Sequence, residues 1–131
     1  MQIIDTKKEF SLMARGRSFV NALRGLGVFL KTTPNAWIQI IILIIACVLG
    51  SYYDISRLDW LMVVIAGGAV LGAEAFNTAI EIDINLTSPN QHPYARDTKD
   101  VAAGAVLITS IMAAIIGLIV FWPYIIPDLL F

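Results

Sequence analysis

Cysteine and histidine are nearly absent from this sequence of 131 residues, which contains one of each. Because a disulfide needs two cysteines, Cys47 alone excludes an intramolecular disulfide, and it argues against a metal–thiolate site. Charge is also scarce, since Asp, Glu, Lys and Arg make up 15% of the residues and the formal net charge is −1. No basic patch is interleaved with aromatic residues, so the sequence predicts no nucleic-acid partner.

Several sequence motifs are absent as well. The chain has no phosphate-binding GxxxxGK[ST] loop, no GxGxxG turn and no protein-kinase HRD and DFG pair, which argues against the soluble nucleotide-binding folds. Residues 1–31 lack both the continuous apolar core and the small-residue cleavage site of a signal peptide. We therefore expect the hydrophobic segments to remain in the mature protein.

Hydrophobic residues are abundant, at 58% of the chain, and the mean hydropathy is +0.77. These values lie outside the range of ordinary soluble proteins and predict a membrane protein. Apolar runs at about 34–53, 58–84 and 98–122 are each long enough to cross the hydrocarbon layer. The expected fold is an all-α membrane protein with three transmembrane helices, in a single integral membrane domain of residues 1–131.

Local signals mark where two of these helices begin. Thr33 followed by Pro34 is typical of a helix start, with Thr33 as the N-cap and proline at the first helical position. The third helix is expected to start near Asp97, whose carboxylate could cap it.

Residues 1–31 combine a polar tail with a helical pattern from about residue 10. Its apolar residues recur at helical spacing, and its cations are Arg15, Arg17, Arg24 and Lys31. This combination predicts an amphipathic helix on the membrane surface, with its cations facing lipid phosphates or a bound anion. The alternative is a cationic flank that only fixes topology. The excess of positive charge predicts that the N-terminus and the loop between the second and third spans are cytoplasmic.

The second span carries two sets of residues at helical spacing. Gly68 and Gly72 form a small-residue pair that favours close packing with another helix. Glu74, Asn77 and Glu81 share a face that is rotated away from the two glycines. We therefore predict that one side of this helix packs and that the other side presents chemistry.

Glu74 and Glu81 are the central candidates for function. Charged residues in a membrane span are costly, so they indicate a functional site unless they pair with basic residues as structural carboxylates. The two glutamates lie two turns apart, roughly 10 Å along the axis, so they cannot share one small ion. Glu81, nearer the cytoplasmic loop, is the candidate ligand for Mg²⁺. Glu74 is the candidate base for a lipid hydroxyl, with Asn77 orienting the acceptor or a phosphate.

Three further residues are candidates for binding ATP. Lys99, near the start of the third span, could neutralise a transferring phosphoryl group. Asp100 is placed beside it, with a rival role as a capping acid of the first helical turn. Arg17 is the candidate from the surface helix.

The segments Glu74-Ala-Phe-Asn-Thr-Ala-Ile-Glu81 and Lys99-Asp-Val-Ala-Ala-Gly104 closely resemble the signature of the small prokaryotic diacylglycerol kinases, a family that includes undecaprenol kinases. The resemblance implies a homotrimer in the bacterial inner membrane that uses MgATP to phosphorylate a lipid hydroxyl at the cytoplasmic face. It also implies Glu74 as catalytic base, Asn77 as an active-site polar residue, Glu81 as metal ligand, and Lys99 with Asp100 as the nucleotide-side pair.

Two positions depart from the family pattern. Thr33 stands where the family usually has a second metal-binding glutamate, and Asn85 stands where an aspartate is common. Fewer anionic ligands weaken metal binding. The main hypothesis is therefore a diacylglycerol kinase, and the alternatives are an undecaprenol kinase or a catalytically impaired homologue with a structural or lipid-binding role.

Overall fold

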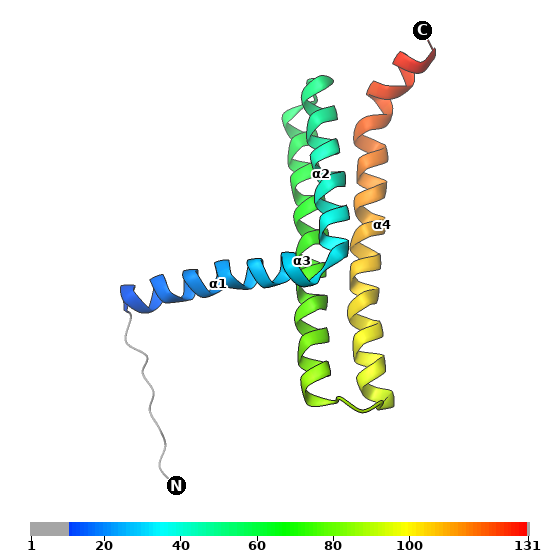
Figure 1. The fold of residues 1–131 in the computed structure, drawn as a ribbon. Helices are drawn as coiled ribbons and strands as arrows, with labels where there is room; N and C mark the ends of the chain where they lie inside the picture. The colour runs from blue at the N-terminus through cyan, green and yellow to red at the C-terminus, as the bar shows by residue number, and fades with distance from the viewer. Residues whose placement is uncertain (1–10, 131) are drawn as a thin grey trace.

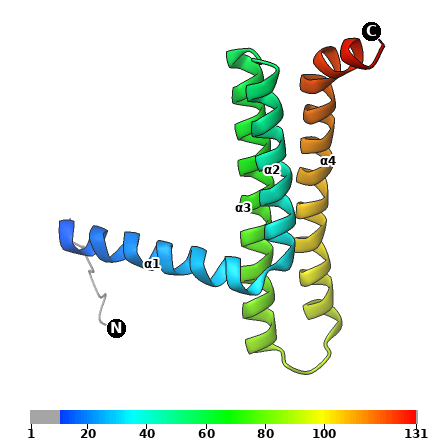
Figure 2. The same ribbon diagram turned by 45° about the horizontal axis from the view of Figure 1, so that its top comes forward.

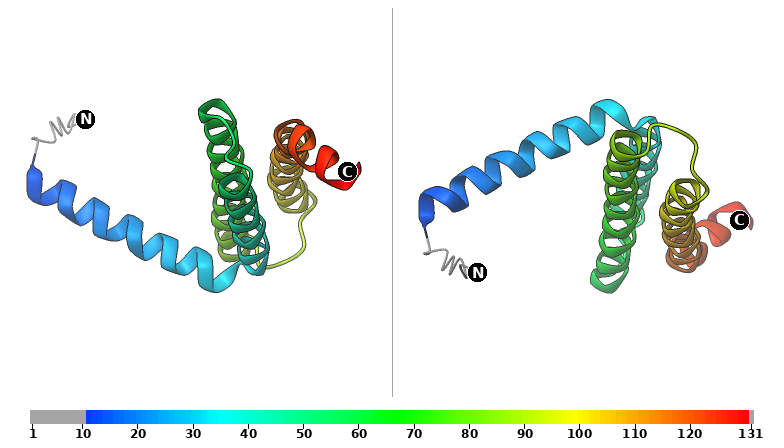
Figure 3. Two further views of the ribbon diagram at one scale, coloured as in Figure 1. Left: turned by 90° about the horizontal axis from the view of Figure 1, so that it is seen from above. Right: turned by 90° about the horizontal axis from the view of Figure 1, so that it is seen from below.

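The computed structural model describes residues 11–130 and forms four helices within that range. Helix α1 (Leu12–Thr32) precedes α2 (Pro34–Tyr52), α3 (Arg57–Thr87) and α4 (Pro93–Leu130). Helices α2, α3 and α4 run side by side as a bundle, and α1 projects sideways from it (Figure 1, Figure 3). The predicted all-helical fold is confirmed.

Three of these helices, α2, α3 and α4, are long and apolar enough to cross a membrane, as predicted. Many large apolar side chains on them are exposed, for example Ile42 at 61% and Leu118 at 63%. A lipid environment covers such surfaces, and helices satisfy their own backbone hydrogen bonds there. The polar tail predicted for residues 1–9 lies outside the described residues.

Helix α4 is longer than the predicted span of 98–122, and the expected cap at Asp97 is wrong. The helix begins at Pro93, which suits the first helical position because it has no N–H to satisfy. The Tyr94 backbone N–H donates a hydrogen bond of 3.2 Å to Nδ1 of His92, so the histidine side chain satisfies a backbone N–H in the first turn of α4. Asp97 therefore lies one turn inside the helix.

The C-terminal part of α4 contains Pro123 and Pro127. Proline removes a backbone hydrogen bond and its ring clashes with the preceding turn, which bends a helix. The last turns of α4 accordingly lean away from the bundle axis (Figure 2).

A short turn joins α2 to α3 and fixes their antiparallel packing. Asp54 adopts a left-handed conformation with φ of 48°, which aspartate tolerates better than most residues. Ser56 and Asp59 then form a reciprocal capping box at the start of α3. Next to this turn, the buried core joins all three bundle helices, around Ile55, Val63, Val120 and Phe121. The apolar core therefore lies at the end of the bundle opposite the α3–α4 loop.

Within the single chain the prediction for the faces of α3 is wrong, whereas packing of Gly68 and Gly72 against another copy stays a prediction. Its buried residues recur every three or four positions and are Val63, Ala66, Val70, Glu74, Asn77 and Thr78. The acidic face is thus the packed face. A Cβ atom added at Gly68 or Gly72 would meet nothing within 4 Å, whereas at Gly67 it would lie 2.6 Å from Cδ1 of Leu43. One residue is about 100° of helix rotation, so the close approach to α2 falls on Gly67.

Candidate active site

Glu74 lies in the interface between α2 and α3 and is only 3% exposed. Its Oε2 atom accepts a hydrogen bond of 3.0 Å from Nε2 of Gln39 on α2. Because a buried carboxylate is costly unless it is hydrogen-bonded, this contact gives Glu74 a partner inside the α2–α3 interface. The sequence did not lead us to predict Gln39 as a site residue. A polar carboxamide within the charge-free apolar run of α2 was the feature that could have indicated it.

Asn77 and Glu81 follow Glu74 along α3 toward the polar end of the bundle. Nδ2 of Asn77 donates to Oε1 of Glu81 at 3.3 Å, one turn further on. Asn77 is 8% exposed, and its Oδ1 atom is buried without a hydrogen-bond partner in the described chain. The two residues therefore offer a carboxylate and an unused carbonyl oxygen close together.

Thr33 occupies the N-cap position of α2, as predicted, but its side chain makes no capping hydrogen bond. Its hydroxyl is 2.7 Å from the hydroxyl of Thr78 on α3, and both residues are buried. Thr33 is thus part of a neutral hydroxyl pair that joins α2 to α3.

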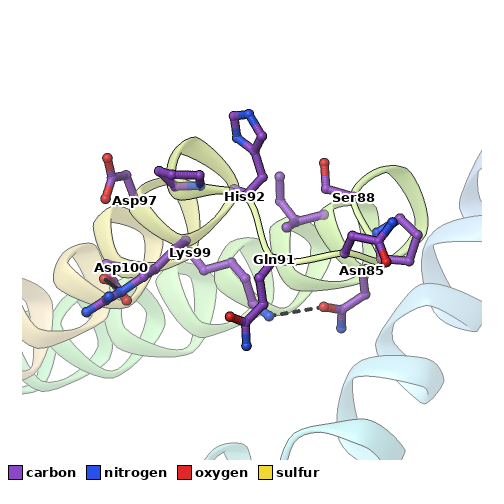
Figure 4. A pocket seen from close by; sticks show the side chains of 13 residues that line it. Asn85, Ser88, Gln91, His92, Asp97, Lys99 and Asp100 are labelled. Atoms are coloured by element: carbon purple, nitrogen blue, oxygen red, sulfur yellow. Dashed lines mark hydrogen bonds and ion pairs between the residues drawn. The ribbon is translucent and has the colours of Figure 1, made fainter.

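A cavity of about 800 Å³ lies where α3 ends and α4 begins. Nζ of Lys99 donates to Oδ1 of Asn85 at 3.0 Å across this cavity (Figure 4). Asp100 also lines it and forms an exposed ion pair with Arg96, at 3.6 Å between Nε and Oδ2. Asp100 is therefore paired with a cation, and its predicted role as a first-turn cap is wrong because α4 begins at Pro93.

The cavity has a mixed polar and apolar lining. Its other lining residues come from the last turn of α3, the loop and the start of α4, and are Ile84, Ser88, Pro89, Asn90, Gln91, His92, Pro93, Ala95 and Asp97. Arg96 also lines the cavity, and its two cations, Lys99 and Arg96, together with these polar side chains suit a phosphorylated ligand.

Arg17 is separated from these residues in the single chain. It is exposed in the N-terminal half of α1, the part that projects away from the bundle (Figure 3). Glu74, Asn77 and Glu81 are brought onto one line along α3, and Lys99 lies beyond them at the loop end. The assignment of Arg17 to the nucleotide stays a prediction.

The described residues contain no cluster of three or more His, Cys, Asp or Glu side chains that could hold a metal by themselves. Mg²⁺ in proteins is commonly held by one or two carboxylates together with substrate phosphates and water. The Glu81 carboxylate and the free Oδ1 of Asn77 fit such a partial site. They fit a metal ion that arrives with its nucleotide better than a permanent structural ion.

Comparison with known proteins identifies the family. Residues 20–121 match the family description "Prokaryotic diacylglycerol kinase". An undecaprenol kinase of Bacillus subtilis is 33% identical over 107 residues, which cover 82% of this chain and 87% of that protein. A diacylglycerol kinase of Helicobacter pylori is 29% identical over 76% of this chain and 84% of its own length. The diacylglycerol kinase of Escherichia coli is 24% identical over 81% and 93%. The chain belongs to the prokaryotic diacylglycerol kinase family and is a phosphotransferase with an alcohol acceptor.

Proposed function

We propose that this protein is a lipid kinase of the bacterial inner membrane, which transfers a phosphoryl group from MgATP to the hydroxyl of diacylglycerol and forms phosphatidic acid. The observation that carries the proposal is the buried Glu74 carboxylate, held by Gln39 in the α2–α3 interface. In this proposal the hydroxyl of a lipid dissolved in the bilayer enters the α2–α3 interface to meet this carboxylate.

The roles of the residues follow from their order along α3. Glu74 accepts the proton of the lipid hydroxyl, and Asn77 orients the acceptor or a phosphate oxygen. Glu81 lies nearer the cavity and would hold Mg²⁺ together with the nucleotide. A bound Mg²⁺ would supply positive charge against the phosphate groups.

Lys99 and Asp100 are proposed to bind the nucleotide at the cavity between α3 and α4. Lys99 supplies a cation that is held by one neutral acceptor, Asn85, and is therefore available to phosphate. Arg17 is proposed as a further nucleotide contact. Because it lies on the projecting part of α1, this contact requires a neighbouring copy in the proposed homotrimer.

The proposed orientation places the N-terminus and the α3–α4 loop in the cytoplasm, where ATP is found. This follows from the positive residues of α1 and from Arg96 and Lys99 in the first turns of α4, compared with the single Arg57 at the other end of the bundle. Helix α1 is proposed to lie on the membrane surface, since its exposed apolar side chains Phe19, Leu23 and Leu26 would otherwise face water.

A second candidate acceptor is undecaprenol. The similarity to the undecaprenol kinase of Bacillus subtilis extends over most of both chains and favours it. Both lipids present one hydroxyl on a hydrocarbon body, so the described contacts at Glu74 suit either one.

Transfer of labelled phosphate from ATP to each lipid, in mixed micelles with and without Mg²⁺, tests the proposal. We expect Mg²⁺-dependent labelling of diacylglycerol, and its loss in Glu74→Gln. Asp54→Asn is the matched control, because it also neutralises one acid but lies in the turn at the opposite end of the bundle. Labelling of undecaprenol alone would show that undecaprenol, and not diacylglycerol, is the acceptor. Labelling of neither lipid would favour the catalytically impaired homologue. Normal turnover in Glu74→Gln would remove the base assignment.

A further inference from the structure

Gln39 presents two polar atoms, and only one of them has a partner in the described chain. Its Nε2 donates to Oε2 of Glu74 at 3.0 Å. This contact fixes the orientation of the amide, because an ionised carboxylate can only accept hydrogen bonds. The other atom, Oε1, is buried without a hydrogen-bond partner.

The free Oε1 atom belongs to a residue on the wall of a second cavity. This cavity has a volume of about 390 Å³ and lies between α2, α3 and α4. Its lining is apolar except for Gln39 and Ser110; the other residues are Ile42, Leu43, Ile45, Ala46, Leu49, Val63, Ala66, Gly67, Val70, Ala113, Ala114, Ile116, Gly117 and Phe121. A buried acceptor in such surroundings lowers the stability of every state of the protein that does not supply it with a donor.

Protonation of Glu74 supplies that donor. In the proposed reaction the lipid hydroxyl gives its proton to Glu74, the lipid oxygen bonds to the γ-phosphorus, and the bond from that phosphorus to ADP breaks. The proton on Glu74 later leaves to water. While it is present, Glu74 carries an O–H group directly beside Gln39.

We propose that Gln39 is a positioning residue that serves Glu74 in both protonation states. Its Nε2 donates one hydrogen bond to the carboxylate. When the carboxyl is protonated, Oε1 of Gln39 also accepts a second hydrogen bond from the Glu74 O–H group. A carboxamide can do this because it carries a donor and an acceptor on one carbon. Only the catalytic consequence rests on the proposed function; the paired hydrogen bonds do not.

Infrared spectroscopy tests the pairing without any substrate. The protein in lipid bilayers is titrated to acid, and the carbonyl band of protonated Glu74 is identified by its absence in Glu74→Gln. We expect this band at the lower frequency of a doubly hydrogen-bonded carboxyl, and at a higher frequency in Gln39→Met. Ile41→Met is the matched control on the same helix, because Ile41 is 55% exposed and lies outside the site. An unmoved band in Gln39→Met would overturn the pairing.

Gln39→Glu keeps the size of the side chain and removes its N–H donor, so it tests the pairing if the methionine variant fails to fold. Two facing carboxyl groups can exchange hydrogen bonds when both are protonated. At acid pH we therefore expect the added carboxyl band at the same low frequency as that of Glu74. An added band at the higher frequency of a carboxyl without hydrogen bonds would contradict the contact between Gln39 and Glu74.

Kinetics test the positioning role separately. Loss of a hydrogen bond to a charged group predicts a fall in kcat of about 10- to 100-fold in Gln39→Met, with the KM for ATP unchanged and the Ile41→Met control active. A changed KM for ATP with an unchanged kcat would overturn the role. If the native protein transfers no phosphate, the proposed function fails, and the infrared result still decides the pairing.

Discussion

Gly67 and Gly68 are neighbours on α3 that differ in their surroundings, so alanine at each position gives a matched comparison. A Cβ atom at Gly67 would lie 2.6 Å from Cδ1 and 3.0 Å from Cδ2 of Leu43, whereas at Gly68 it would meet nothing within 4 Å. Both substitutions add one methyl group, and both gain about 1 kcal/mol of helix propensity. The difference between their unfolding free energies therefore isolates the packing of α2 on α3.

The size of that difference follows from the contact. Overfilling a packed interface costs about 1–3 kcal/mol. The clashing atoms are the ends of the Leu43 side chain, which can move off its rotamer at a cost of about 0.5–1.5 kcal/mol. We expect Gly67→Ala to be about 1–2 kcal/mol less stable than Gly68→Ala.

Reversible unfolding in mixed micelles, followed by circular dichroism, measures both variants. Chemical crosslinking monitors oligomeric state, so that a contact of Gly68 with another copy is detected separately. Shortening Leu43 to alanine in the Gly67→Ala background should remove much of the added penalty, as a double-mutant cycle would report. Equal stability of the two glycine variants, with oligomeric state unchanged, would refute the close approach at Gly67.

Three further predictions concern the ends of the bundle and the site. Ser56→Ala removes the capping box of α3 and should lower the unfolding free energy by about 0.5–2 kcal/mol in the same unfolding assay; no change would show that the cap is not stabilising. Thr33→Val leaves the Thr78 hydroxyl buried without its partner and should cost about 1–3 kcal/mol. Replacing both threonines by valine should cost less than the sum of the single changes, and simple additivity would contradict the 2.7 Å hydroxyl pair. Lys99→Met should lower MgATP-dependent transfer while Arg57→Met, at the opposite end of the bundle, leaves it unchanged; equal effects would contradict a local role for Lys99.

The sequence was sufficient to predict the three membrane-crossing helices. A run of about 20 apolar residues has one stable arrangement in hydrocarbon, because a helix satisfies its own backbone hydrogen bonds. The start of α2 at Pro34 was also readable, since proline fits the first helical position. The motif around Glu74 and Glu81 led to the family, which the comparisons confirm.

The limits of α4 were less predictable. Its first turn includes a hydrogen bond from the Tyr94 backbone N–H to the His92 side chain. A single histidine in a polar loop sequence is not enough to predict such a contact. Its C-terminal turns continue past Pro123 with a bend, although proline usually signals the end of a helix.

Only the tertiary structure decided which face of α3 is buried and which partners its polar residues take. Spacing along a helix shows that Glu74 and Asn77 share a face, but the rotation of that face toward α2 depends on side chains 35 and 45 positions away in sequence, in the Gln39–Glu74 and Thr33–Thr78 contacts. The helical period is a local property of the chain, whereas the rotation of each helix about its own axis is set by how its neighbours pack against it. The sequence by itself therefore determined the helices and the chemical groups they carry, and the packing of α2 on α3 determined that Glu74 is buried beside Gln39.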